Sequence, residues 1–166
     1  MADAGFLPAL LLAGGVIHAP PPAASPDAIP FQFAPLTWGM TEQAARGLFP
    51  KLEGLAMDPG QPEATLSLAD VAVAGCRFTA TLDFERGRLS ALSLDSNGAA
   101  HLKQCGAKIK DALARQYGGE PGGFSTAPNP HGYSEYAAWR GPVTEATYAA
   151  LDGGFMTLRF ARTPGR

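Results

Sequence analysis

The chain has 166 residues, a formal net charge of −2 and only 17% charged residues. This length fits one domain, or one domain with a tail. The near-zero net charge excludes a nucleic-acid-binding protein that works through a broad basic field, and 46% apolar residues exclude an acidic disordered chain.

The N-terminus predicts a secretory signal peptide over residues 1–24. Residues 6–17 (FLPALLLAGGVI) form an apolar run that is too short to cross a bilayer, which takes roughly 20 residues. Cleavage is expected after Ala19 or Ala24, although neither site has the A-x-A form and the first five residues lack Lys and Arg. Two alternatives stay open: an apolar N-terminus that docks on a partner, and a misassigned start codon that removed a basic segment.

Prolines predict an extended linker over residues 25–35. Six of them lie between Pro20 and Pro35, and proline cannot donate the amide hydrogen bond that helices and sheets need. The folded part is therefore expected to be a single domain over residues 36–166.

The folded part begins with a short predicted helix over residues 41–49 (TEQAARGLF), which Thr37 or Thr41 can cap and Pro50 stops. Strands are expected next, over residues 65–74, 76–85 and 88–94.

The second strand and the second predicted helix each point a cysteine inward. Apolar and polar residues alternate over residues 76–85, so Cys76 belongs to the buried set. Residues 99–117 carry apolar residues at helical spacing, and Cys105 lies in that stripe. The pair predicts a disulfide, against two free buried thiols and against a metal site completed by His101.

The C-terminal part contains a loop over residues 118–132 and three more predicted strands, over residues 133–140, 143–151 and 155–162. The expected fold class is α+β: two helix-then-three-strand units, an antiparallel meander sheet and helices packed on one face.

Turn length predicts the register of the last strands. A three-residue loop, Asp152-Gly153-Gly154, pairs Tyr148 with Leu158 and Ala146 with Phe160, so that apolar residues share one face. The same reasoning across Gly141-Pro142 places Trp139 and Ala137 on the core face. The polar face then receives Tyr136, Arg140, Glu145, Thr147 and Arg159.

In the hairpin formed by residues 76–85 and 88–94, the expected strand pairing conflicts with the alternation of apolar and polar residues. Pairing Phe84 with Leu89 places Leu92 and Leu94 on the polar face. Either a β-bulge near Ser90-Ala91 turns the two leucines inward, or they form an exposed apolar pair that contacts a partner. Leu92 and Leu94, together with Tyr136, are therefore the candidate partner-binding residues.

The motifs of common catalytic sites are absent from the sequence. There is no GxSxG or SxxK motif, and the glycine-rich residues 118–123 follow a helix, where phosphate-binding loops do not lie. His131, in the loop 118–132, has no orienting partner nearby in the sequence. We therefore expect no catalytic residues, no metal and no cofactor.

Three short motifs resemble small exported bacterial proteins: Leu36-Thr37-Trp38-Gly39-Met40-Thr41, the hairpin at residues 84–89 (FERGRL), and Gln116-Tyr117-Gly118. They resemble the helix-plus-sheet modules of the BamE/SmpA type and the related β-lactamase-inhibitor-like fold. The resemblance covers residues 36–118 and extends to about residue 162 by the order of the predicted elements. It implies an envelope protein that binds other proteins without catalysis, but this sequence lacks the acylated cysteine of that lipoprotein family.

Two functional hypotheses follow. The first is a non-catalytic protein-interaction module of the bacterial envelope, periplasmic or secreted, with an unknown protein partner. It would be a monomer or weak dimer that binds no nucleic acid and has no transmembrane helix. The second is a small-ligand binder or minor hydrolase with a pocket under the loop 118–132 and His131 at its rim.

Overall fold

The structure is a computed structural model that describes residues 29–54, 63–97, 102–118, 134–151 and 154–163. The predicted signal peptide, His101 and His131 lie outside these residues, as does nearly all of the loop 118–132.

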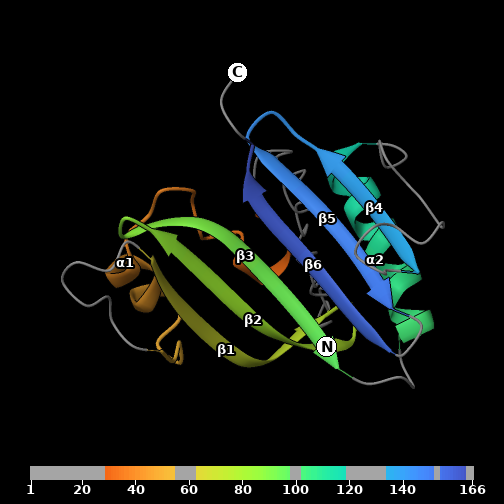
Figure 1. The fold of residues 1–166 in the computed structure, drawn as a ribbon, viewed down its shortest axis with the longest axis horizontal. Coiled ribbons are helices and arrows are strands. Elements are labelled where there is room, and N and C mark those ends of the chain that lie inside the picture. The colour runs from red at the N-terminus through yellow and green to blue at the C-terminus, as the bar shows by residue number, and fades with distance from the viewer. Residues whose placement is uncertain (1–28, 55–62, 98–101, 119–133, 152–153, 164–166) are drawn as a thin grey trace, which may run out of the picture.

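Six strands of the described chain form one antiparallel sheet with the order β1-β2-β3-β6-β5-β4 (Figure 1). The strands are β1 (Glu63–Val73), β2 (Cys76–Glu85), β3 (Arg88–Asn97), β4 (Glu135–Arg140), β5 (Thr144–Leu151) and β6 (Phe155–Arg162). The helical elements in the same residues are η1 (Phe31–Phe33), α1 (Glu42–Leu48) and α2 (Leu102–Tyr117).

The predicted architecture of two equivalent helix-then-three-strand units in a meander, with helices packed on one face, is wrong. The molecule is mostly sheet, and β3 pairs with β6 instead of β4. The 16-residue helix α2, about 24 Å long at 1.5 Å per residue, lets the chain re-enter the sheet at its far edge, so the last three strands run back toward β3. Helix α1 has only seven residues and a single buried one, Ala45, while α2 contacts β4 and β6. The two helices therefore form no common layer.

Local sequence determines the two hairpins of the first half-sheet. Ala74-Gly75 and Arg86-Gly87 are two-residue turns with positive φ at both positions, 51° and 82° in the first and 49° and 71° in the second. Paired positive φ values match the right-handed twist of the flanking strands, which is why such turns close tight hairpins.

The predicted register of the last strands is confirmed. Tyr148 pairs with Leu158, Ala146 pairs with Phe160, and Trp139 lies opposite Ala146. Trp139 is 3% exposed, as expected of a core residue.

The predicted bulge is also present. Asp83 pairs with Ala91 but Phe84 pairs with Leu89, so Ser90 is the extra residue of β3. The shift turns Leu92 and Leu94 into the core, where both are fully buried.

The segment before α1 closes the core, which differs from the predicted linker over residues 25–35. Ile29, Phe33 and Leu36 are almost completely buried. The ring of Phe31 meets the ring of Phe160 edge-on, with 6.4 Å between centroids. Residues 29–35 therefore belong to the folded domain. Burial of their apolar side chains stabilises this segment in the fold.

Candidate binding site

The two cysteines form a disulfide, as predicted. Cys76 at the start of β2 is bonded to Cys105 on α2, with 6.0 Å between the Cα atoms, and each residue is less than 10% exposed. Both sulfur atoms are therefore taken, which overturns the alternatives of two free thiols and of a metal site. The bond ties α2, which contacts β4 and β6, to the other half of the sheet.

Two of the three candidate partner-binding residues are unsuited to that role. Leu92 and Leu94 are fully buried and offer nothing to a partner. Tyr136 is half-buried and pairs with Ala149 on the other face of the sheet.

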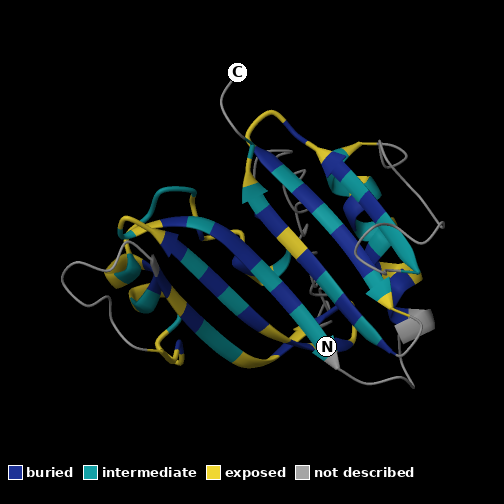
Figure 2. Ribbon diagram, in the orientation of Figure 1, coloured by how far each residue is buried: buried dark blue, intermediate teal, exposed yellow. Residues whose placement is uncertain are grey.

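That other face carries mostly short side chains, and we call it the open face. The buried side chains of α2 and of the segment before α1 belong to the core cluster, together with the side chains of the opposite, core face. Figure 2 shows the open face toward the viewer, with buried, half-buried and exposed residues alternating along each strand. Its hydroxyl-bearing residues come from five of the strands: Thr65, Ser67, Thr79, Thr81, Ser93, Thr147 and Thr157.

Ion pairs join strands across the open face. Arg159 on β6 reaches over β3 to Asp83 on β2, with 3.3 Å between Nη1 and Oδ2, and the same nitrogen lies 3.4 Å from the Ser93 hydroxyl. Arg140 donates two hydrogen bonds to Glu145, at 3.0 and 2.8 Å.

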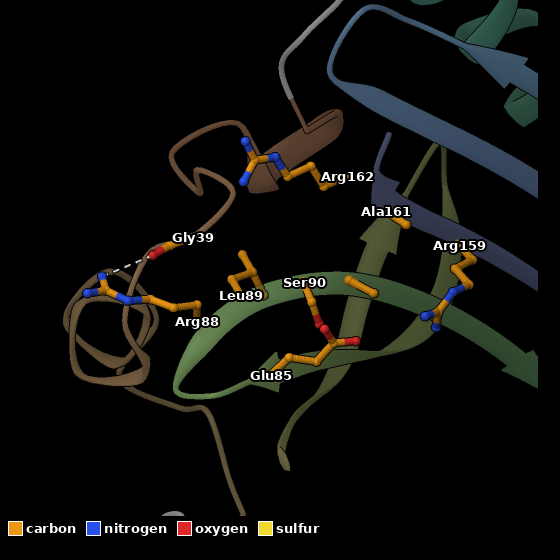
Figure 3. Close-up of a pocket in the computed structure, with 9 residues that line it drawn as sticks. Gly39, Glu85, Arg88, Leu89, Ser90, Arg159, Ala161 and Arg162 are labelled. Carbon is orange, nitrogen blue, oxygen red and sulfur yellow. Dashed lines mark hydrogen bonds between the residues drawn. The ribbon is translucent and has the colours of Figure 1, made fainter. Parts of the chain in front are cut away.

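A pocket opens at one end of the sheet, at the edge of the open face, and Leu89 and Arg162 line it from core-face register positions (Figure 3). Its volume is about 350 Å³, and three arginines, Arg88, Arg159 and Arg162, line it together with Glu85. Pairing between β3 and β6 ends at Ala91 and Ala161, and beyond this point Gly39 takes over as the neighbour of β3 by donating to the carbonyl of Leu89. The pocket therefore lies where the hydrogen-bonded neighbour of β3 changes from β6 to Gly39.

A second polar cluster lies between α2, β4 and β5. The Tyr148 hydroxyl donates to Glu135 at 3.3 Å, and Lys110 Nζ donates to the same oxygen at 2.8 Å while lying 5.3 Å from the Tyr148 ring centroid. Burial, and then the charge of Glu135 and its hydrogen bond, hold the pKa of Tyr148 well above the ordinary tyrosine value. A hydroxyl with a raised pKa keeps its proton at neutral pH, so it serves as a hydrogen-bond donor that clamps these elements and not as a base.

Sequence reasoning finds part of this site. It places Arg159 on the polar face, where the structure has it exposed. It does not single out Asp83 or Glu85 as site residues, whereas Asp83 pairs with Arg159 and Glu85 lines the pocket. The usable signal is the bulge itself, because bulges often lie beside binding sites.

Comparison with protein-family models, curated proteins and solved structures gave no match. The resemblance of residues 36–118 to the BamE/SmpA and β-lactamase-inhibitor-like proteins therefore stays a prediction. Within the described part of the chain, no helix is long and apolar enough to span a membrane.

Proposed function

We propose that the protein is a non-catalytic protein-interaction module of the bacterial envelope, periplasmic or secreted, which holds its partner on the open face. The observation that carries this proposal is the contrast between the two faces of the sheet. One face is built into a continuous core, and the other presents short hydroxyl and alanine side chains together with ion pairs that join neighbouring strands.

The disulfide supports the proposed location. Structural disulfides form and persist in oxidising compartments outside the cytoplasm, and the apolar N-terminal run fits an export signal.

Site-specific crosslinking tests the proposal. A photoreactive amino acid replaces Thr79, which is exposed on the open face, and the full chain is irradiated in its native host. The matched control carries the same group at Ala107, which is exposed on α2. We expect a discrete crosslinked protein from position 79 and not from position 107. Identical products from both positions, or none from position 79, would refute a partner on the open face.

The second hypothesis, a small-ligand binder or minor hydrolase under the loop 118–132, has no support from the described geometry, because His131 and residues 119–133 lie outside it.

A further inference from the structure

The geometry points to the arginine-lined pocket as a carboxylate-binding subsite that takes an acidic side chain from an extended peptide segment of the partner. This inference rests on the proposed function and names the chemistry of the partner at one place on the open face.

The pocket has a positive excess. Three arginines and one glutamate line it, and Asp83 pairs with Arg159 beside it, so the formal charge of this group is +1. The three arginines come from two strands, Arg88 from β3 and Arg159 and Arg162 from β6. An anion is therefore favoured over a cation, and the planar guanidinium is the side chain best suited to bind a carboxylate with two parallel hydrogen bonds.

Most N–H donors of the three arginine side chains make no hydrogen bond with the described residues. Arg88 donates from Nη1 to the carbonyl of Gly39 at 3.2 Å, and Arg159 uses only Nη1 in its long contacts with Asp83 and Ser93. The side chain of Arg162 makes no hydrogen bond or ion pair with the residues that the structure describes, while its backbone pairs with Thr144 in the sheet. Because a guanidinium has five N–H donors, most of these remain for a ligand.

Two small side chains form the pocket floor. Ala91 and Ala161 pair across β3 and β6, Ala91 almost completely buried and Ala161 half-buried, so no long side chain projects from the sheet at this pair. The volume of about 350 Å³ lies near the lower end of the usual range for ligand pockets, roughly 300–1,000 Å³, which suits one side chain and its adjoining backbone.

Glu85 distinguishes a peptide from a simple anion. In Figure 3, Glu85 and Arg159 lie on one side of the pocket, and Arg88 and Arg162 extend toward the Gly39 side. Glu85 has no ion-pair partner among the described residues, so its carboxylate is available as an acceptor. An acidic residue in a peptide brings both groups that this lining needs, a carboxylate for the arginines and backbone N–H donors for Glu85. Acetate or phosphate brings only the first.

The test uses the full oxidised chain and follows the backbone amides of Ser90, Ala91 and Ala161 by NMR. The probes are acetyl-Gly-Asp-Gly-amide, its asparagine counterpart, sodium acetate and inorganic phosphate. We expect the aspartate peptide to shift these amides at lower concentration than the other three probes, and its binding to weaken as salt is raised. Equal shifts from the asparagine peptide, or from acetate or phosphate at equal concentration, would overturn the inference, as would the absence of any shift.

Two variants locate the interaction. Arg162→Gln should weaken binding of the aspartate peptide about tenfold, since it removes a charge-assisted contact. Arg77→Gln removes the same charge from an exposed site at the opposite end of β2 and should leave binding unchanged. Glu85→Gln should strengthen acetate binding and weaken the preference for the peptide. Equal effects of the variants at residues 162 and 77 would show general electrostatic attraction and refute the subsite.

The carboxylate subsite and the proposed function can fail independently of each other. A crosslink from Thr79 that survives in Arg162→Gln, with no peptide bound in the pocket, keeps the interaction module and removes the carboxylate subsite. Peptide binding without a Thr79 crosslink would instead keep the subsite and remove the partner on the open face.

Discussion

Single residues decide how closely neighbouring segments approach each other. Gly54 has φ of +134°, and a Cβ atom at this position would lie 2.6 Å from the backbone oxygen of Thr65. The segment before β1 meets that strand here, since Glu53 and Ser67 exchange backbone hydrogen bonds at 2.8 and 2.7 Å. A side chain at position 54 would be strained at this φ angle and would clash with the Thr65 carbonyl oxygen. Only glycine therefore fits at this position.

Gly54→Ala should lower the free energy of unfolding by about 1–3 kcal/mol, because it adds both backbone strain and a clash. Urea unfolding measures the change. Gly47→Ala is the control, since Gly47 lies in α1 and a methyl group added there would meet nothing within 4 Å. Alanine at that position should raise stability by up to about 1 kcal/mol. A Gly54 variant as stable as the wild type would contradict the close approach.

Tyr148 makes stability depend on pH in the alkaline range. Its raised pKa means that the folded state holds the proton more tightly than the unfolded state, where tyrosine titrates at about 10. The stabilisation is therefore complete below pH 10 and is lost as pH rises above it, with a slope of up to about 1.4 kcal/mol per pH unit from this one group.

Tyr148→Phe should flatten this dependence. Chemical unfolding at pH 9, 10 and 11 should show a steeper loss of stability in the wild type than in the variant. Some slope will remain in the variant, because burial also raises the pKa of Tyr117. Parallel profiles would show that Tyr148 ionises equally in both states.

Strands and helices differ in how far local sequence predicts them. The alternation over residues 76–85 predicts β2 with its correct bounds, and the loop of three residues before Phe155 predicts the β5–β6 register. Local periodicity carries no information on which strand lies beside β3, because that pairing depends on where α2 returns the chain. The linker predicted over residues 29–35 differs from the structure for a related reason. Its prolines exclude regular structure but do not exclude burial.

The disulfide should contribute strongly to stability, since it closes a loop over a sequence separation of 29 and holds α2 to the half-sheet that α2 does not otherwise contact closely. Replacing both cysteines with alanine, Cys76→Ala with Cys105→Ala, should cost about 3–4 kcal/mol by the chain-entropy relation. Thermal unfolding with and without dithiothreitol measures it. The reductant should lower the melting temperature of the wild type and leave the double variant unchanged, and a wild type insensitive to complete reduction would refute the role.

The two faces of the sheet differ across the whole molecule: one is built into the core, and the open face is the one that we propose for recognition. Sequence alternation identifies most of this division, including the outward position of Arg159, but counting in steps of two fails for Leu92 and Leu94 once the bulge at Ser90 shifts the register. The pocket is beyond prediction for the same reason. It requires the bulge, the end of the β3–β6 pairing and the arrival of Gly39 at one place, and these are far apart in the sequence.

The core depends on the segment that lies before α1, and this sets the boundary of the domain. Phe33 is fully buried and its ring packs against Phe49, with 5.5 Å between centroids. Phe33→Ala should therefore cost about 3–5 kcal/mol, the usual effect of emptying a buried aromatic site. Gln32→Ala, one residue away and exposed, should change stability by less than about 0.5 kcal/mol. Urea midpoints of the two variants measure the difference. Equal midpoints would return residues 29–35 to the linker and move the start of the domain to residue 36, whereas the expected gap places it no later than Phe33.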